Sequence, residues 1–355
     1  MRLLWMVWML ISASSKRFRP LTCGARMDEI PNDNGIAISR LQLDDLPALL
    51  QLSQSQGWSH TKRDWDNMLK TGKTFGHYQT GESKNGTSLI SCAHFTEFGK
   101  DLASLGMVIV SQRFRNRGLA TSLIRNVMDH NHKQHQSRPL GLIASTKAQP
   151  LYPRFGFDLT GEYILKLTRT GCSSTTPFEH DVDDQEVHVR PLGKPEDIQD
   201  IIRLDHESTG LDRGDVVRRL LESSEAVCVA EVRETETTMG WKPSIMGYGV
   251  AKRQGDLLNI GPLIAPDSKI ASVLCRELIA GHNDGPIRMD VFESQREFVK
   301  TITSTTTTSS HGLDFLQADR QALMIKWPSY EENSSARKLP GHRQVMFCPA
   351  SQAWL

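Results

Sequence analysis

An internal repeat constrains the fold more than any other feature, because a duplicated pattern requires two copies of one structural unit. The segment VHVRPLGKPEDIQDIIRLDHESTGL repeats the pattern of IAISRLQLDDLPALLQLSQSQGW, with Asp197 lying 152 positions after Asp45. Two later matches keep a similar offset: Asp256 and Gly261 follow Asp101 and Gly106 by 155, and GLDF at Gly312 follows GFDL at Gly156 by 156. Three matches in one order predict two copies of an α/β unit.

Composition is consistent with this organisation. The 355 residues are 38% hydrophobic, enough for two ordinary domains with cores of their own. Lys and Arg number 42 against 41 Asp and Glu, and this balance argues against a general nucleic-acid binder. The six cysteines are scattered without a C-x-x-C pair, which favours a reduced, intracellular setting. No H-E-x-x-H motif occurs, and we expect no metal site.

Hydrophobic periodicity predicts the elements of the first copy. Apolar residues alternate in strands and recur every three or four positions in helices. Thr61 is expected to cap a helix, with Asp64 at the capping-box position and Gly72 at its end. The predicted order begins with a strand at 36–41, a helix within 44–58 and a second helix within 60–73. A hairpin of 75–80 and 87–98, turned through 84–86, follows, and then a strand at 102–110 and a helix from 118 to about 133. A strand at 139–145, a short helical segment and a closing strand at 163–169 complete the copy.

The same reading divides the chain into segments. Residues 1–35 are a leader or targeting segment, 36–169 the first domain, 170–186 a polar linker, and 187–355 the second domain with a Thr-rich loop at 301–311. The first 27 residues hold five basic residues and no acidic one. They include an apolar run that is too short for a membrane span. A secretory signal, a mitochondrial presequence and a dispensable leader before Met27 all fit. We expect a cytoplasmic protein, with mitochondria as the alternative.

The stretch VIVSQRFRNRGLATSLIRNVM carries the clearest chemical signal. An apolar strand runs into a basic loop, and Gly118 then opens an apolar-periodic helix. The first turn of such a helix has free N–H groups, and its dipole favours negative charge. Gly118 and the small Ala120 leave the backbone bare for a diphosphate, while Arg115 and Arg117 supply positive charge. The stretch therefore predicts an anion site.

This loop resembles the acyl-CoA loop of the GNAT (Gcn5-related) N-acetyltransferase superfamily. The family pattern V-x-P-x-aromatic-R-G-x-G-x-G/A reads here as Val110-Ser-Gln-Arg-Phe-Arg-Asn-Arg-Gly-Leu-Ala120. Gln112 stands where proline is usual and Asn116 where glycine is usual. The resemblance implies two tandem GNAT folds, α/β (α+β), each a mixed and mainly antiparallel sheet flanked by helices. The residues it assigns to acetyl-CoA are Val108, Ile109, Val110, Arg115, Asn116, Arg117, Gly118, Leu119, Ala120, Thr121 and Ser145.

A second family signal follows the next strand. GNAT proteins often carry A-x-x-L-Y-x-x-x-G-F there, and this chain has the matching residues Ala148 to Phe157. In the family this tyrosine commonly protonates the departing CoA thiolate, so the resemblance implies a general-acid role for Tyr152. Ser145 replaces an asparagine often found there, and Pro153 predicts a short or kinked helix. The resemblance covers about Ile36 to Arg169.

The implied activity is N-acyltransfer, with an amine attacking the thioester directly in a ternary complex. The resemblance assigns the oxyanion donor to a strand backbone N–H in Val108–Val110. Glu97 and His94 are candidates for the base, and Glu97 is the one we name. The expected partners are acetyl-CoA and an amine acceptor, either a small molecule or a protein lysine, without nucleic acid or stable membrane insertion. The alternative is a catalytically silent acyl-CoA sensor or scaffold.

The second copy lacks both the Arg/Gly loop and the tyrosine motif. PDSKIASVL from Pro266 replaces the Arg/Gly loop, and no R-x-x-G-x-A occurs there. An offset of 156 from Tyr152 reaches Thr308, inside the threonine run. We therefore expect a degenerate second copy and one cofactor site in the chain.

Overall fold

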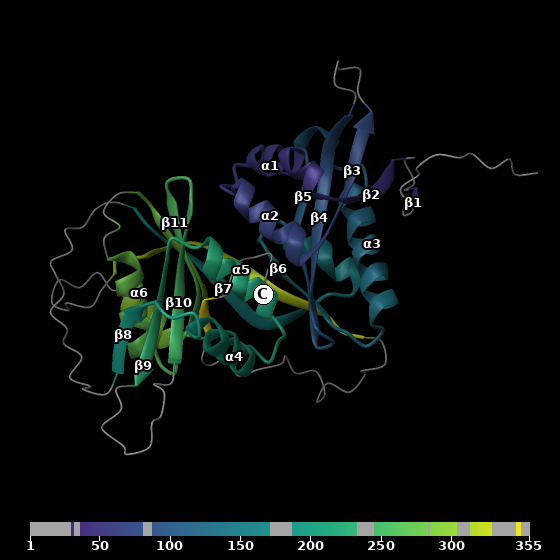
Figure 1. Ribbon diagram of the computed structural model, residues 1–355. Coiled ribbons are helices and arrows are strands. Elements are labelled where there is room, and N and C mark those ends of the chain that lie inside the picture. Colours follow the sequence, from purple (N-terminus) through teal and green to yellow (C-terminus); the bar gives the residue numbers. More distant parts are fainter. Residues whose placement is uncertain are drawn as a thin grey trace, which may run out of the picture.

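The computed structural model describes residues 30–31, 36–80, 87–170, 187–232, 245–280, 282, 285–303, 313–328 and 346–348. Both copies have one order of elements, each opening with a strand and two helices (Figure 1). The first copy comprises β2 (Ala37–Leu41), α1 (Leu46–Gln54), α2 (Lys62–Thr71), β3 (Gly72–Thr80), β4 (Thr87–Phe98), β5 (Leu102–Val110), α3 (Leu119–Gln134), β6 (Leu140–Ala144), the 3-10 helix η3 (Gln149–Phe155) and β7 (Asp158–Arg169). A short strand, β1 (Ile30–Pro31), precedes β2.

The second copy repeats this order. It comprises β8 (Val187–Pro191), α4 (Asp197–Thr209), α5 (Gly214–Ser223), β9 (Ala226–Val232), β10 (Ile245–Gln254), β11 (Leu257–Ile264), α6 (Ser268–Ile279), β12 (Ile287–Phe292), α7 (Arg296–Thr303), β13 (Leu316–Lys326) and β14 (Met346–Cys348). Residues 301–303 belong to α7 rather than to the Thr-rich loop predicted there, because they continue its hydrogen-bonded turns. The leader before residue 30, the turn at 84–86, linker residues 171–186 and the rest of that loop lie outside the described residues.

The helix predicted from Thr61 is confirmed at the level of its cap. The Thr61 side chain accepts a hydrogen bond from the Asp64 N–H at 3.2 Å, and Asp64 Oδ2 accepts one from the Thr61 N–H at 2.7 Å. This reciprocal pair satisfies backbone donors that the helix cannot satisfy itself. The helix ends at Gly72, as the sequence predicted.

All strands of the described residues join one sheet that runs through both copies. Its order is β1-β2-β3-β4-β5-β6-β13-β7-β12-β11-β10-β9-β8, with β14 paired to β11. The pairs β5–β6 and β11–β12 are parallel and the others antiparallel. The predicted fold class, a mixed and mainly antiparallel sheet flanked by helices, is confirmed.

The two copies exchange their last long strands. The sequence predicted that residues 163–169 close the first copy's sheet, but β7 does not pair with β6. Instead β13 lies between them, with Ala322 opposite Ala144, and β7 pairs with β12 of the second copy, with Arg169 opposite Ile287. Alternation of apolar residues shows that a segment is a strand but not which strand it pairs with. Each copy is therefore completed by the other.

Helices cover both faces of the first copy's sheet. On one face α3 buries Leu123, Ile124 and Val127 against the sheet. On the other face α1 and α2 share a core with α5 of the second copy, in which Trp65 packs with Val216 and Leu220. The interface between the copies is thus part of a hydrophobic core. No helix in the described part of the chain is long and apolar enough to cross a membrane.

Candidate functional site

A β-bulge near the end of β5 creates the site. Cys92 lies opposite Ile109 and His94 opposite Gly106, so Met107 and Val108 both oppose Ala93. Met107 has a φ of 52°, the left-handed conformation of a bulge residue. Such a bulge bends the strand and increases its twist. The last residues of β5 stay paired with β4 and turn away from β6, the strand on the other side.

Strands β5 and β6 pair only near their starts, before the bulge. Their parallel pairing is limited to Ala103–Leu140 and Ser104–Gly141. The N–H of Ser111 donates to Ile90 of β4 at 2.8 Å, and successive N–H groups of a strand point to opposite edges. The N–H of Val110 therefore points to the edge left open by β6. The edge of Val108–Val110 that does not pair with β6, together with the end of β6, is called the first wedge.

The loop after β5 delivers a bare helix N-terminus to this edge. Gly118 is the N-cap of α3, with a φ of 76°, and no side chain caps the helix there. Asn116 has a φ of 62°, which explains how it can stand where glycine is usual, since asparagine tolerates the left-handed region. Leu119 anchors the first turn in the core, while Ala120 and Thr121 are partly exposed. The unfilled donors of this turn suit an anion.

The arginines predicted to bind phosphate are both exposed at this loop, and one is held in place. Arg115 donates from Nε to the carbonyl of Val110 at 3.3 Å and from Nη2 to Oε1 of Gln56 at 2.6 Å. The guanidinium of Arg117 lies 5.1 Å from the ring centre of Phe114, a cation–π contact. Arg115 thus ties the loop to both the strand end and the segment that joins α1 to α2.

Tyr152 lies on η3, directly after β6, and is only 6% exposed. Its ring contacts Phe157 at a centroid distance of 5.8 Å, and the same core contains Ala322 and Met324 of β13. Burial raises the pKa of Tyr152 to about 12, so the phenol stays protonated at neutral pH. A protonated phenol is a potential proton donor.

Ser145 and Pro153 shape the segment that carries Tyr152. The backbone oxygen of Ser145 accepts hydrogen bonds from the N–H groups of Ala148 and Gln149, each at 2.9 Å. Its Oγ accepts a further bond from Ala148 N–H at 3.3 Å. With Pro153 inside it, the segment is a short 3-10 helix, as the sequence predicted. Ser145 therefore fixes the start of η3 beside the first wedge.

Glu97 and His94 are not brought to the first wedge. Glu97 lies opposite Ala103, at the start of β5, and pairs with Lys73 at 2.9 Å and Arg138 at 2.7 Å. Burial works to raise its pKa, but these two cations hold the pKa of Glu97 below its ordinary value. His94 is fully buried, with both ring nitrogens 2.9 Å from threonine hydroxyls, and burial lowers its pKa to about 3. Both residues have structural partners of their own.

The second copy has the same bulge but a different helix start. Gly261 and Pro262 both oppose Val250, and β11 pairs with β12 only from Leu258 to Ile260. The connection to α6 spans only residues 265–267, against 111–118 in the first copy. Asp267 caps α6, its carboxylate accepting from the N–H of Ile270 at 2.9 Å. A side-chain carboxylate thus takes the position where an anionic ligand would bind.

The chain itself occupies the corresponding opening beside β11. Strand β14 pairs with β11 there, with Met346 opposite Ile264 and Cys348 opposite Leu263. Met346 is buried, and its carbonyl accepts a hydrogen bond from Gln295 Nε2 at 3.2 Å. The position where pairing with β12 ends is filled by a third strand.

The strand register also identifies the second copy's equivalent of Tyr152. Tyr152 lies 12 residues after Leu140, and Val299 lies 12 residues after Ile287, the matching parallel partner. The sequence offset pointed to Thr308 instead. Thr308 itself lies outside the described residues, and α7 ends before it, at Thr303. The second copy has no hydroxyl at the position of Tyr152.

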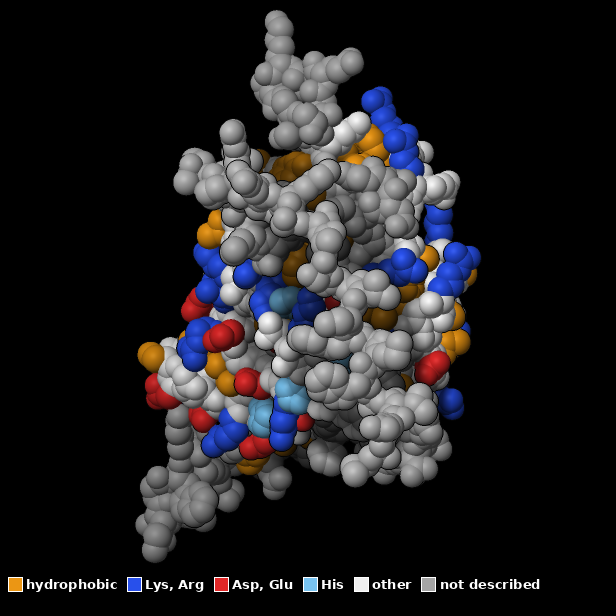
Figure 2. All heavy atoms as spheres, turned by 90° about the vertical axis from the view of Figure 1, so that its right-hand side faces the viewer, with side chains coloured by type: hydrophobic (Ala, Val, Ile, Leu, Met, Phe, Trp, Pro, Cys, Tyr) orange, Lys and Arg blue, Asp and Glu red, His pale blue; other side chains and the backbone are white. Residues whose placement is uncertain are grey.

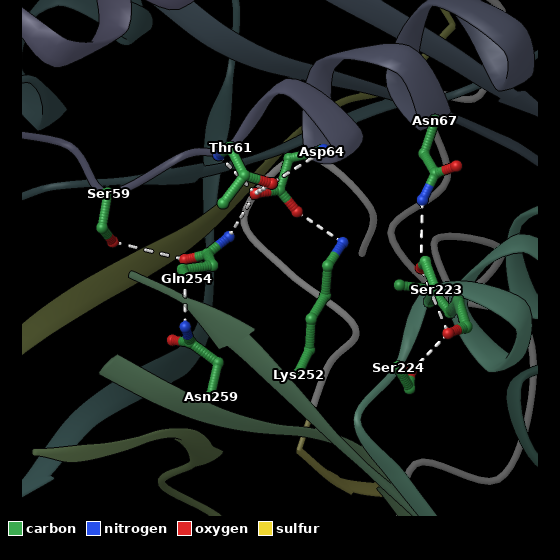
Figure 3. Close-up of polar contacts among 10 residues, drawn as sticks. Ser59, Thr61, Asp64, Asn67, Ser223, Ser224, Lys252, Gln254 and Asn259 are labelled. Atoms are coloured by element: carbon green, nitrogen blue, oxygen red, sulfur yellow. Dashed lines mark hydrogen bonds and ion pairs between the residues drawn. The ribbon is translucent and has the colours of Figure 1, made fainter. Parts of the chain in front are cut away.

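Polar contacts fasten the first turn of α2 to the second copy's β10–β11 hairpin (Figure 3). Asp64 forms an ion pair with Lys252 and accepts a hydrogen bond from Gln254 Nε2 at 3.0 Å. Farther along α2, Asn67 Nδ2 donates to Ser223 Oγ at 3.1 Å. These contacts hold the second copy over the side of the sheet that carries α1 and α2.

Two contributions to the site had no signal in the local motifs. Gln56, which holds Arg115, belongs to a segment whose sequence indicates only a helix end. Ala322 and Met324 pack around Tyr152 from about 170 residues away in the chain. Trp65 is fully buried and donates a hydrogen bond from Nε1 to Ser53 Oγ at 3.0 Å.

Other chemistries find less support among the described residues. Cys92 is fully buried, and burial raises the pKa of its thiol, which opposes a nucleophilic role. Within the described ranges no three His, Cys, Asp or Glu side chains are placed to hold a metal ion. On the face shown in Figure 2, basic side chains are interspersed with hydrophobic and acidic ones.

Comparison with known proteins places this geometry in a family. Two family models, each described as an acetyltransferase (GNAT) domain, match residues 72–166 and 201–335. The uncharacterized N-acetyltransferase YitH of Bacillus subtilis is 25% identical over 253 residues, covering 71% of this chain and 80% of YitH.

Solved structures agree on the fold. A Pyrococcus horikoshii crystal structure has a TM-score of 0.64 at 14% identity and covers 91% of this chain and 97% of its own. A tandem GNAT protein from the clavulanic acid biosynthesis pathway has a TM-score of 0.56 at 11% identity and covers 83% of this chain and 99% of its own.

Proposed function

Since the chain is a tandem N-acetyltransferase of the GNAT family, we propose that its first copy alone transfers an acyl group, acetyl by preference, from acyl-CoA to a primary amine. The observation that carries this proposal is the contrast between the two helix starts. Gly118 leaves the N-terminus of α3 uncapped, whereas Asp267 caps α6.

The first wedge offers each part of acyl-CoA a partner. The N-terminus of α3 and the guanidinium groups of Arg115 and Arg117 would bind the diphosphate. The pantetheine arm would lie in the first wedge against the edge of Val108–Val110, where the N–H of Val110 is available to a carbonyl oxygen. Ser145 and Tyr152, which follow β6 in the chain, would lie beside the thioester sulfur.

The reaction follows from this placement. The neutral amine attacks the thioester carbonyl carbon, the C–N bond forms, and the negative charge on oxygen is stabilised by a strand N–H of Val108–Val110. The C–S bond then breaks, and Tyr152 donates its proton to the departing thiolate. The amine nitrogen loses its extra proton to water, so the products are the amide and the free thiol of CoA. Glu97 takes no part, since Lys73 and Arg138 bind it at the far end of β5.

Steady-state kinetics of Tyr152→Phe test the proposal. We expect kcat to fall about 100-fold or more, because general acids contribute at least that much, while CoA affinity stays within about twofold. Tyr163→Phe is the matched control, because Tyr163 packs against the same core and has no role in the proposed reaction. Tight CoA binding without turnover on any amine would instead favour a silent acyl-CoA sensor.

A further inference from the structure

A row of polar side chains crosses the middle of the continuous sheet. Neighbours in register place Lys252 beside Asn259, Asn259 beside Arg288, Asp290 beside Lys166, and Lys166 beside Asp319. The alternate residues Leu165, Leu167, Met289 and Val291 point into a hydrophobic core on the other face. We call these six residues the polar row: Lys252, Asn259, Arg288, Asp290, Lys166 and Asp319.

One end of the polar row is neutralised by the protein itself. Asp64 pairs with Lys252, and Asn259 Nδ2 donates to Gln254 Oε1 at 2.9 Å (Figure 3). Next along the row, Arg288 binds Asp290 through two hydrogen bonds of 2.9 and 2.6 Å. A bidentate pair of this kind satisfies both charges.

At the other end of the polar row, Lys166 and Asp319 form no salt bridge with any described residue. Lys166 is partly exposed, and the neighbouring carboxylates of Asp290 and Asp319 interact with its charge electrostatically. Asp319 accepts hydrogen bonds only from neutral donors, the Arg320 N–H at 2.8 Å and Gln321 Nε2 at 3.1 Å. The two residues are in register on adjacent strands, which lie about 4.8 Å apart.

This end of the polar row lies next to the proposed site of transfer. The register that pairs Ala322 with Ala144 brings Gln321 beside Ser145, and Thr146 Oγ1 donates to the Arg320 carbonyl at 3.0 Å. Asp319 is two residues farther along β13, or about 7 Å. Leu323, on the same side of β13, shares a core with Met107 and Ile109 of β5.

Building on the proposed function, we propose that Lys166 and Asp319 bind the acceptor and that the acceptor is an amine that also carries a carboxylate. Lys166 would bind the carboxylate, and Asp319 would accept hydrogen bonds from the amine end as it approaches the thioester. Arg288 and Asp290 already neutralise each other, so the remaining pair has zero net charge. A ligand with one charge of each sign complements it, whereas a diamine would add a cation beside Lys166.

Paired substrates test this assignment. Acetyl transfer from acetyl-CoA is measured by thiol release with amino acids of increasing chain length, such as 4-aminobutyrate and 6-aminohexanoate. Each is compared with the alkylamine that lacks its carboxylate. For the wild type we expect a KM about tenfold lower for the better amino acid than for its alkylamine, the value of one charge-assisted contact.

Variants then locate the contact. Lys166→Met should raise KM for the amino acid about tenfold and leave KM for the alkylamine unchanged, while Lys166→Arg should retain most of the preference. Asp319→Asn should raise KM for both substrates. Lys133→Met removes an exposed lysine of α3 and serves as the control. Thermal melting and CoA titration of each variant separate loss of folding from loss of the contact.

The possible outcomes distinguish failure of the acceptor assignment from failure of the proposed function. Equal KM values for an amino acid and its alkylamine, or a Lys166→Met effect of the same size on both, would overturn the assignment while leaving acyl transfer intact. Absence of turnover with every amine, with CoA still bound, would refute the proposed function. In that case calorimetric binding of the amino acids, lost in Lys166→Met, would still support the site, and absence of binding would overturn it as well.

Discussion

The carboxylate of Asp267 accepts a hydrogen bond from the N–H of Ile270 at 2.9 Å, so the helix after β11 is capped from within the chain. An aspartate at this position satisfies a backbone donor and places negative charge at the positive end of the helix dipole. The equivalent helix of the first copy begins at Gly118, which has no side chain for either task. One duplicated element has thus acquired two different electrostatic roles.

We therefore predict that one chain binds one molecule of CoA. Isothermal titration should give a stoichiometry near one, and Arg115→Ala should weaken binding by removing a charged contact to the diphosphate. Asp267→Ala is the matched change in the second copy, expected to lower stability by about 1 kcal/mol without adding a second site. Two equivalents of CoA bound to the wild type would contradict the prediction.

Gly118→Ala should weaken CoA binding through the backbone. The φ of 76° costs a non-glycine residue about 1 kcal/mol, and a Cβ at this position meets no atom within 4 Å. Relaxation of this strain would rotate the N–H groups of the first helical turn. CoA titration and thermal melting measure the two effects. Asn116→Gly is the control, because it relieves the same conformation two residues earlier and should leave affinity intact or improved.

The ion pair between Asp64 and Lys252 should couple the two copies energetically. The side chains of Asp64 and Lys252 are only 6% and 10% exposed, so removing one partner leaves an uncompensated charge. We expect Lys252→Met to destabilise the protein by about 3 kcal/mol. Asp64→Asn should cost more, since it also weakens the cap of α2. Urea unfolding of the single and double variants forms a double-mutant cycle, and additive effects would show that the pair contributes no coupling.

Stability should fall with acidification because of buried histidines. Burial lowers the pKa of His94 to about 3, against an ordinary value of 6.5, so unfolding at intermediate pH takes up a proton. The stabilising contribution is present above pH 6.5 and declines as the pH falls toward 3. His60 and His77, whose pKa values burial lowers to about 4, act in the same direction.

Urea denaturation between pH 7 and pH 4 checks this dependence. His94→Gln should be less stable than the wild type at pH 7, because it disturbs the bonds to Thr74 and Thr96. Its stability should nevertheless fall less steeply, by about 1.4 kcal/mol per pH unit, since one fewer proton is taken up on unfolding. Parallel curves for the two proteins would rule out the assignment.

Local signals in the sequence predicted the local structure. The capping box of Thr61 and Asp64, the strand before Val110 and the helix from Gly118 all lie where the sequence places them, because neighbouring residues determine caps and periodicity. The fold class followed from the repeat and from the family motif.

Contacts between distant segments could not be predicted in this way. Nothing in the sequence of β13 shows that it pairs with β6, since any apolar strand satisfies the same alternation. Glu97 was named from its strand position, but Arg138 and Lys73, from elements far along the chain, determine its environment. The position of Val299 depends on a strand register, which an offset counted across an insertion does not preserve.

The exchange of β7 and β13 also determines when the first copy can finish folding during synthesis. The first copy lacks a central strand of its sheet until Leu316–Lys326 has left the ribosome, some 150 residues after Arg169. At about 5–20 residues per second this interval lasts about 8–30 s. During this interval β6 lacks its pairing partner β13, and the core around Tyr152 lacks the β13 residues that pack in it. The acyl-CoA site that we propose can therefore be completed only after Leu316–Lys326 has been made.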